Sequence, residues 1–268
     1  MKRSRGSLAG SGGQAPQALK VLLAAVCLLL SLPLPASQAR DLVVIGEPTL
    51  MTALQRVGAA WRVRSGVRVN VFVAPSDLSF AQIDRGARCD VVFALAGPAT
   101  QDAERRGTIK RAPNVPTFGN RLELVARAGE AAMAGDRAEP ASVIAGKRLA
   151  IANPDRDLAG AYALAWLGEL ASRAETDKKL LVAESSAGVV EFLGSGTADL
   201  GIVYATDLAA YPGVTALMPL PEQSHPPIRY LAEQASGQES DPSQFFTFLR
   251  SDEAKSILQA AGLQVVRE

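Results

Sequence analysis

The sequence has few of the residues on which metal sites and nucleic-acid contacts depend. Its 268 residues include one His and two Cys, and 28 Lys and Arg stand against 27 Asp and Glu. A net charge of +1 provides no basic excess for phosphate backbones, which weighs against nucleic-acid binding. His and Cys lack metal-site spacing, and the glycines form neither a dinucleotide-binding fingerprint nor a phosphate-binding loop.

The N-terminal 39 residues have the pattern of a secretory signal peptide. They begin with basic residues and continue with an apolar run, residues 21–32, that is too short to span a bilayer. Ser37-Gln38-Ala39 then has the small-x-small pattern of a cleavage site. We therefore expect cleavage after Ala39 and a periplasmic location, with residues 1–39 outside the folded protein.

Removal of this signal leaves a slightly acidic chain with one cysteine. The signal contains Lys and Arg but no Asp or Glu, so its loss lowers the net charge. Cys89 alone remains, which excludes an intrachain disulfide, and its place at the start of an apolar run predicts a buried, inert thiol. No second apolar run is long enough to cross a membrane.

Strand and helix patterns alternate along the rest of the chain. Apolar or alternating runs predict strands at residues 42–45, 67–73, 89–95, 122–126, 148–152, 180–182, 200–204, 214–219 and 228–232. Helices are predicted at residues 50–61, 78–85, 99–106, 140–146, 159–173, 186–193, 242–249 and 252–261. This alternation predicts an α/β protein with largely parallel sheets.

The stretch 41–61 organises this pattern, because it reads as a buried strand, a sharp turn and a helix with Thr49 as its N-cap. Such a helix start lies at the carboxyl end of a strand, where open α/β sheets bind ligands and anions are favoured. Similar turns occur at 75–77, 157–160 and 184–187. If all four face one cleft, their free N–H groups could bind a small dianion without a side-chain cation.

Catalytic patterns are weak. His225 lies in a Ser-His-Pro-Pro stretch typical of a surface loop, and no nucleophile-elbow motif is present. The cluster 155–157 is most simply a solvated turn. Tyr204 ends a buried strand, where its phenol is either a donor in a cleft or a satisfied core hydroxyl, and the sequence favours neither.

Two sections of the chain resemble each other. Residues 83–86 lead through Asp90 into an apolar strand, and residues 193–196 lead through Asp199 into another. Each section is a helix end, a glycine-containing turn, an Asp and a buried strand. This similarity favours two related α/β lobes.

The chain resembles the periplasmic molybdate-binding proteins of ABC importers, which are type II periplasmic solute-binding proteins. The resemblance rests on QIDRGARCDVVFA, FGNRLELVA, RLAIANPDRDLAGAYA and ADLGIVYATDL, which occur in the family's order and spacing over about residues 41–263. It implies a two-lobed α/β fold with a ligand cleft between the lobes. We expect the first lobe at 40–121 and 220–268, the second at 122–219, and a hinge where the chain crosses.

The resemblance also implies a ligand and a set of contacts. In this family a tetrahedral oxyanion, molybdate or tungstate, binds through hydroxyls and backbone amides without a free metal cation or a cofactor. The matching positions in this sequence are Thr49, Ser76, Ala159, Ser186 and Tyr204. Around the first of them, Glu47 and Pro48 replace the family's small residues, and Asp77 follows Ser76. These acidic residues are candidate modifiers of specificity, because carboxylates near a dianion repel it, and Pro48 removes one N–H donor.

The resemblance implies a monomeric receptor, not an enzyme, that delivers its ligand to an ABC permease in the inner membrane. Three alternatives remain: a receptor paralogue that binds another small anion or organic solute, a secreted enzyme on the same scaffold, and the effector domain of a regulator. The absence of a catalytic pair weighs against the second, and the signal peptide weighs against the third.

Overall fold

The structure is a computed structural model that describes residues 40–112, 115–130, 139–170, 179–237 and 240–266. The predicted signal peptide and the end of the helix predicted at 159–173 lie outside these ranges. Residues 40–268 form one compact unit. In the described ranges no helix is both long and apolar enough to cross a membrane.

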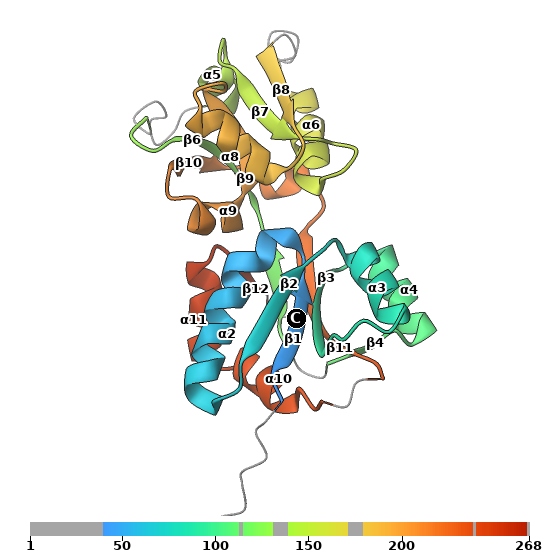
Figure 1. Cartoon of the computed structure of the whole chain (residues 1–268). Coiled ribbons are helices and arrows are strands. Elements are labelled where there is room, and N and C mark those ends of the chain that lie inside the picture. Colours follow the sequence, from blue (N-terminus) through green and yellow to red (C-terminus); the bar gives the residue numbers. More distant parts are fainter. Residues whose placement is uncertain (1–39, 113–114, 131–138, 171–178, 238–239, 267–268) are drawn as a thin grey trace, which may run out of the picture. The chain divides into compact units, whose positions relative to one another are not determined.

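The described strands form two sheets (Figure 1). The first sheet is seven-stranded, with the order β12-β5-β11-β3-β1-β2 and with β4 paired to β11. Its strands are β1 (Leu42–Gly46), β2 (Val69–Val73), β3 (Val91–Leu95), β4 (Ile109–Arg111), β5 (Thr117–Asn120), β11 (Ile228–Ala235) and β12 (Gln264–Val266). The short strands β4, β5 and β12 were not predicted from the sequence.

The helices around the first sheet come from both ends of the chain. They are the 3-10 helix η1 (Pro48–Leu50) and the α-helices α2 (Met51–Ser65), α3 (Ser76–Asp84), α4 (Pro98–Arg106), α10 (Ser243–Leu249) and α11 (Asp252–Ala260). Trp61 of α2 packs on Phe245 and Phe248, with ring centroids 5.7 and 5.4 Å away. Both phenylalanines lie on α10, so this contact joins α2 to a helix near the end of the described chain. We call this sheet with its helices the first lobe.

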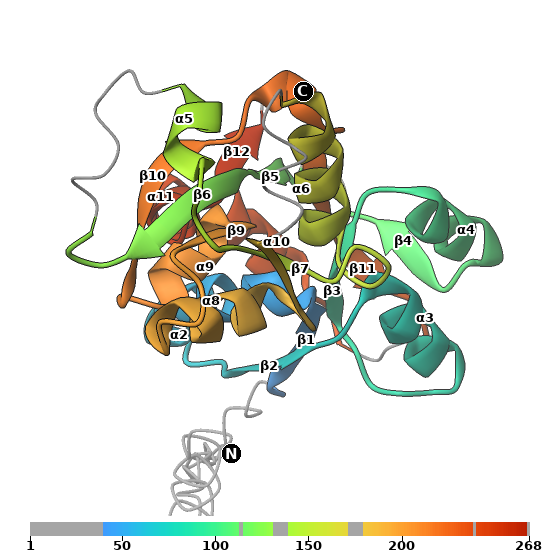
Figure 2. The ribbon, with the colours of Figure 1, turned by 90° about the horizontal axis from the view of Figure 1, so that it is seen from above.

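The second sheet has five strands in the order β10-β6-β9-β7-β8. These are β6 (Leu122–Arg127), β7 (Leu149–Ala152), β8 (Leu180–Ala183), β9 (Leu200–Tyr204) and β10 (Val214–Pro219). Its helices are α5 (Pro140–Ile144), α6 (Leu158–Glu169), α8 (Ser186–Gly194) and α9 (Ala205–Ala210). Helix α9 contacts α2 and η1 of the first lobe, and Figure 2 shows α9 near α2 when seen from above. We call this sheet with its helices the second lobe.

Both sheets are mixed, so the prediction of largely parallel sheets is wrong. Strand β1 is parallel to β2 and β3, and β7 is parallel to β8 and β9. The other pairings are antiparallel, and they involve β4, β5, β6, β10, β11 and β12. Helical crossovers produce the parallel pairs, whereas β6 and β11 enter the sheets where the chain passes between lobes and run in the opposite direction.

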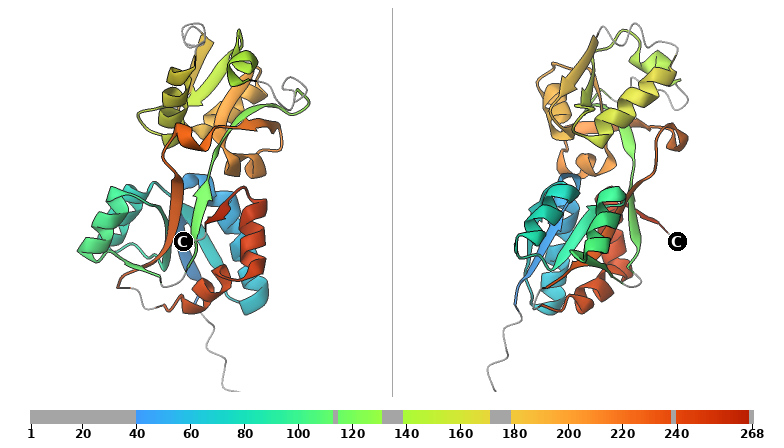
Figure 3. Two further views of the ribbon diagram at one scale, coloured as in Figure 1. Left: turned by 180° about the vertical axis from the view of Figure 1, so that it is seen from behind. Right: turned by 90° about the vertical axis from the view of Figure 1, so that its right-hand side faces the viewer.

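The chain passes between the lobes at two places that lie side by side (Figure 3). Arg121 separates β5 of the first sheet from β6 of the second. The return path runs from β10 to β11 through the 3-10 helix η4 (Glu222–Ser224). The backbone N–H of Leu220 donates to the carbonyl oxygen of Leu122 at 2.9 Å, so the two crossings are in direct contact.

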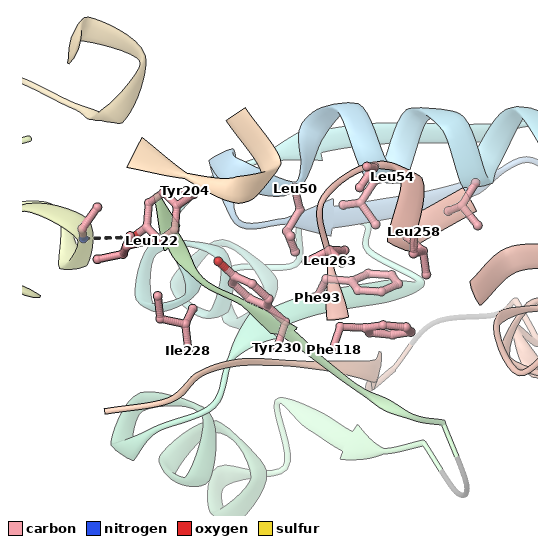
Figure 4. Packing of buried hydrophobic residues seen from close by; sticks show 14 of the residues in the cluster. Leu50, Leu54, Phe93, Phe118, Leu122, Tyr204, Ile228, Tyr230, Leu258 and Leu263 are labelled. Atoms are coloured by element: carbon pink, nitrogen blue, oxygen red, sulfur yellow. Dashed lines mark hydrogen bonds between the residues drawn. The ribbon is translucent and has the colours of Figure 1, made fainter. Parts of the chain in front are cut away.

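The core consists of the apolar runs that predicted the strands. All five residues of β1 and all five of β9 are buried. In the first lobe, Phe93, Phe118 and Tyr230 lie together under Leu50 and Leu54 (Figure 4). Cys89 is buried as predicted, and burial raises the pKa of its thiol to about 12, which makes it a poor nucleophile.

Candidate functional site

The first wall of the candidate site is the pair of turns that follow β1 and β2. Glu47 directly follows β1, and its side chain reaches the first turn of α3. Its Oε1 accepts hydrogen bonds from the backbone N–H of Ser76, at 2.8 Å, and from the Ser76 hydroxyl. The Ser76 oxygen in turn accepts from the N–H of Leu95 at 2.8 Å. Ser76 is therefore where it was predicted, but its hydroxyl hydrogen is already donated to Glu47.

The second wall contains Asp157, the N-cap of α6, which binds three donors. Its Oδ1 accepts from the N–H of Ala159 and from the Tyr204 hydroxyl, each at 2.9 Å, and its Oδ2 accepts from the N–H of Ser186 at 3.2 Å. The Ala159 N–H also lies 3.1 Å from the Tyr204 oxygen. Three groups expected to contact a ligand thus share one carboxylate of the chain itself.

A third carboxylate, that of Asp207 on α9, holds the remaining hydroxyl. Its Oδ2 accepts from the Ser186 hydroxyl and, at 3.0 Å, from the N–H of Tyr204. Burial raises the pKa of Asp207 to about 6, the nearby charge of Asp157 adds to this, and the two hydrogen bonds oppose it. Asp207 is therefore partly protonated in mildly acidic solution.

Two cavities adjoin at this place, and residues of both lobes line each of them. The larger, of about 600 Å³, is lined by residues that include Glu47, Ser76, Asp157 and Tyr204. The smaller, of about 210 Å³, is lined by residues that include Asp157, Ser186 and Asp207. Thr49 belongs to both linings, as do Pro48 and Asp157. We call the two cavities together the cleft.

Thr49 connects the cleft to the place where the chain crosses between lobes. Its Oγ1 lies 3.1 Å from the hydroxyl of Tyr230 on β11. The side-chain amide of Asn120 donates to that hydroxyl at 3.4 Å and to the Thr206 hydroxyl of the second lobe at 3.1 Å. This chain of hydrogen bonds couples a predicted ligand residue to both lobes.

A close backbone approach positions the second wall. A Cβ at Gly160 would lie 2.1 Å from the carbonyl oxygen of Ala152, so only glycine lets α6 begin this close to the end of β7. That approach places the neighbouring Ala159 N–H between Asp157 and the Tyr204 hydroxyl. The sequence RLAIANPDRDLAG therefore encodes the position of a backbone donor.

The Tyr204 hydroxyl in the cleft is un-ionised at neutral pH, and the pKa of Glu47, like that of Asp207, is raised. Burial is the main cause that raises the pKa of Tyr204 well above its usual value, and the charge of Asp157 adds to it. Burial also raises the pKa of Glu47, although its hydrogen bonds from Ser76 lower it; the charges of Asp77 and Asp157 act in the same direction as burial. The Tyr204 hydroxyl is thus a donor at neutral pH.

Four of the five predicted contact residues line the cleft: Thr49, Ser76, Ser186 and Tyr204. Ala159 lies just behind it, joined to Tyr204 by its N–H. Asp77 also lines the larger cavity, is exposed, and makes no hydrogen bond or ion pair with another described residue. For Tyr204, which the sequence left undecided, the structure combines both descriptions, because it is buried and satisfied yet lines the larger cavity.

Three expectations about the cleft are wrong. Thr49 is not an N-cap, because the chain forms η1 before α2 and the Thr49 side chain turns to Tyr230. The helix starts do not offer free N–H groups at Ser76, Ala159 and Ser186, because carboxylates of the chain accept from all three. Asp157 is not part of a solvated turn, although Asp155 and Arg156 beside it are exposed.

Several residues that organise the cleft were not predicted from the sequence: Asn120, Asp157 and Tyr230. The capping role of Asp207 was not predicted either. Asp157 was detectable, because Asp immediately before an apolar helical run is a common N-cap. Asn120 and Tyr230 carried no such local signal, since their partners are 86 and 181 residues away in the chain. Within the described ranges, no cluster of His, Cys, Asp or Glu is arranged to hold a metal ion.

Comparisons with known proteins agree on the fold. The chain is 27% identical to the molybdate-binding protein ModA of Escherichia coli over 228 residues, which is 83% of this chain and 88% of that protein. Its structure resembles the substrate-binding domain of a putative molybdenum ABC transporter from Clostridium difficile, with a TM-score of 0.71, 20% identity, and coverage of 85% of this chain and 100% of that one.

The periplasmic molybdate-binding protein of Azotobacter vinelandii gives a TM-score of 0.64 at 22% identity, with the same coverage. These structures confirm the expected two-lobed α/β fold of periplasmic binding proteins. A family model described as bacterial extracellular solute-binding protein matches residues 42–264. That match spans nearly all of the described chain, and the protein therefore belongs to the bacterial extracellular solute-binding protein family.

Proposed function

We propose that this chain is the solute-binding receptor of an ABC importer and that its cleft binds a tetrahedral oxyanion, with molybdate and tungstate as the first ligands to test. The observation that carries this proposal is the gathering of Ser76, Ser186 and Tyr204 from distant parts of the sequence at one cleft. Each presents a hydroxyl beside a backbone N–H at the start of a helix. Such donors suit oxygen ligands, and here they already hold carboxylate oxygens.

The proposed lobes follow the two sheets. Residues 40–121 and 220–268 would form the first lobe and residues 122–219 the second. The contact between Leu122 and Leu220 supports a hinge at the two crossings. A receptor of this kind acts as a monomer in the periplasm after cleavage behind Ala39 and delivers its ligand to an inner-membrane permease. The relatives are named as binding proteins, which supports a receptor rather than an enzyme.

A second candidate is a receptor that has changed its ligand. The specific observation in its favour is that Glu47, Asp157 and Asp207 occupy the donors that a bare dianion would need. An incoming molybdate would have to replace these carboxylates or lie against them, and burying like charges together is costly. This candidate keeps the cleft and the transport role and changes only the solute.

Calorimetric titration of the exported protein with molybdate, tungstate, sulfate and phosphate tests the proposal. At least one of these ions should bind, and Tyr204→Phe should weaken that binding by about 1.5–3 kcal/mol, the contribution of a hydrogen bond to a charged group. Tyr211→Phe is the comparison within the same cleft: Tyr211 lines the smaller cavity, but its phenol makes no hydrogen bond to the described residues, so its removal should weaken binding less than Tyr204→Phe does. If no ion binds to the folded protein, the oxyanion assignment is wrong and the changed-ligand candidate takes its place.

A further inference from the structure

The side chain of Glu47 points into the cleft region rather than toward a cation or away to bulk solvent. Its Oε1 holds both donors of Ser76. In the described part of the chain no lysine or arginine pairs with Glu47, and the charges that act on it are those of Asp77 and Asp157, which are of the same sign. Glu47 therefore brings to the wall of the larger cavity a carboxylate that forms no ion pair with the described residues.

One oxygen of Glu47 is left over. Oε2 accepts no hydrogen bond from the described residues, and it is not among their buried atoms that lack a partner. Because the side chain lines the cavity, this oxygen is an acceptor within reach of whatever enters. The two sites of Ser76 that could donate to a ligand are used, so the unused hydrogen-bonding capacity at this end of the cleft is that of an acceptor.

An acceptor at this position distinguishes two kinds of oxyanion. Molybdate, tungstate and sulfate are fully deprotonated at neutral pH, so their oxygens carry only lone pairs and are repelled by a carboxylate. Phosphate and arsenate keep at least one O–H at the same pH. That hydrogen can be donated to a carboxylate in a short, charge-assisted O–H···O⁻ bond. A carboxylate that repels one class and binds the other gives specificity through both effects.

We infer that Glu47 determines specificity: the cleft selects a tetrahedral oxyanion that carries a hydrogen, and the ligand O–H donates to Oε2 of Glu47. The inference rests on the proposed function, in which the cleft is the oxyanion site, and it names the class of ion. Asp157 differs from Glu47 because both of its oxygens accept hydrogen bonds. Asp207 has one oxygen without a hydrogen bond from the described residues, but it lines the smaller cavity and not the larger one. In the larger cavity, Glu47 is thus the hydrogen-bonded carboxylate whose free oxygen reads the protonation state of the ligand.

The test compares wild type with Glu47→Gln by calorimetry at pH 7.5 and constant ionic strength, using protein purified from cells that express the full chain. Phosphate and sulfate form the decisive pair, because both are small tetrahedral oxyanions and only phosphate carries a hydrogen; arsenate and molybdate repeat the comparison. We expect wild type to bind phosphate at least tenfold more tightly than sulfate or molybdate. Glu47→Gln, which offers an amide donor instead of a charge, should reduce this preference at least tenfold.

Asp77→Asn is the matched control. It removes one negative charge from the same cavity wall, but Asp77 is exposed and makes no hydrogen bond to the described residues. It should strengthen the binding of all four ions by similar, small factors and leave their order unchanged. If Asp77→Asn changes the order as much as Glu47→Gln does, the general field of the cleft sets specificity and the assignment to Glu47 is wrong.

Two other results separate this inference from the proposed function. If wild type binds molybdate or sulfate at least as tightly as phosphate, and Glu47→Gln does not alter the order, the inference fails while the oxyanion receptor stands. If neither protein binds any of the four ions, although both unfold cooperatively on heating, the oxyanion function itself fails and the inference falls with it.

Discussion

The two lobes use the same device to start a buried strand, but in different surroundings. In the first lobe, Asp90 precedes β3, and its Oδ2 accepts from the N–H of Val43 on the neighbouring strand at 2.7 Å. In the second, Asp199 precedes β9, and its Oδ2 accepts from the N–H of Arg148 beside β7 at 2.8 Å. The similarity predicted from the sequence between these sections thus corresponds to equivalent hydrogen bonds between the parallel strands of two mixed sheets.

The two aspartates differ in how far their side chains are buried. The Asp90 side chain is 1% exposed, and it also accepts from the Ser240 hydroxyl and pairs with Arg88 at 3.3 Å. The Asp199 side chain is 33% exposed and pairs with the guanidinium of Arg148 at 2.5 Å. The comparison shows that one sequence pattern can be a core element in one lobe and a surface element in the other, because the pattern specifies the hydrogen bond but not what covers it.

The lobes also differ in how carboxylates reach the cleft. In the first lobe Glu47 leaves its own turn and caps the neighbouring helix α3. In the second lobe Asp157 caps its own helix α6 and also reaches Ser186 at the start of α8. The second wall is therefore a network that connects two helix starts, whereas in the first wall Glu47 binds the donors of Ser76 alone.

Among the substitutions that test this comparison, Asp90→Ala should have the largest effect on the free energy of unfolding. Removal of the carboxylate leaves a buried N–H at Val43 and the Ser240 hydroxyl without their acceptor. Loss of such a buried partner should lower the free energy of unfolding by about 3–5 kcal/mol. Urea unfolding of the variant and wild type at pH 7 measures the difference. Asp90→Asn retains an acceptor oxygen and should recover part of the loss; an effect of less than about 1 kcal/mol for Asp90→Ala would contradict the assignment.

The next largest effect concerns the pH dependence that Asp207 gives to the second lobe. Its pKa of about 6 in the folded protein lies above the ordinary value of 3.8, so the folded state holds this proton more tightly than the unfolded chain does. The resulting stabilisation is fully present below about pH 3.8 and is lost as the pH rises through about 6. At about 1.4 kcal/mol for each pKa unit, the loss is at most about 3 kcal/mol.

Asp207→Asn isolates this contribution, because Asn does not titrate. The difference in unfolding free energy between the variant and wild type should shift in favour of the variant as the pH rises from 4 to 7.5. Urea titrations at four pH values in this range measure it. A difference that stays constant with pH would show that Asp207 keeps an ordinary pKa. It would contradict the conclusion that burial raises the pKa of this carboxyl.

A smaller effect is expected from Gly160→Ala, which tests the close approach of α6 and β7. The added methyl would lie 2.1 Å from the carbonyl oxygen of Ala152, a backbone atom that cannot rotate away. We expect a loss of about 2 kcal/mol, within the range for overpacked interiors. Gly188→Ala is the control in the first turn of α8, where the nearest atom, the Cβ of Ala183, is 3.2 Å away. Equal losses in both variants would mean that the approach at Gly160 is not special.

The sequence predicted the elements of the fold well where an apolar run ended at a clear turn. Strands 200–204 and 214–219 have the predicted bounds in the structure. It failed for β4, β5 and β12, which are three or four residues long and too short to show a period. Strand direction also escaped prediction, because it depends on where the chain crosses between the lobes and not on local pattern.

In the candidate site, the sequence located the hydroxyls but not their partners. Ser76 and Ser186 were identified, yet the carboxylates that bind them come from Glu47 and Asp207, 29 and 21 residues away. The sequence identified Glu47 as a departure from the family's small residues in the first turn. The direction of its side chain, however, depends on the spacing of β1 and β2 in the folded sheet. A local pattern can therefore predict which groups face a cleft, while the fold determines which of them remain unpaired.

The smallest effect is expected from Asp199→Ala, the counterpart of the first substitution. The pKa of Asp199 falls to about 2, mainly through its hydrogen bond from Arg148, so its stabilisation is present above the ordinary value of 3.8 and is lost as the pH falls through about 2. Because the pair lies at the surface, solvent screening should limit the loss at pH 7 to about 1 kcal/mol. Unfolding in urea at 0.05 and 0.5 M NaCl measures it, and the loss should shrink at the higher salt concentration. A loss as large as that of Asp90→Ala, or one unchanged by salt, would show that the two aspartates contribute equally to stability. The difference in their burial would then not explain how the two lobes differ.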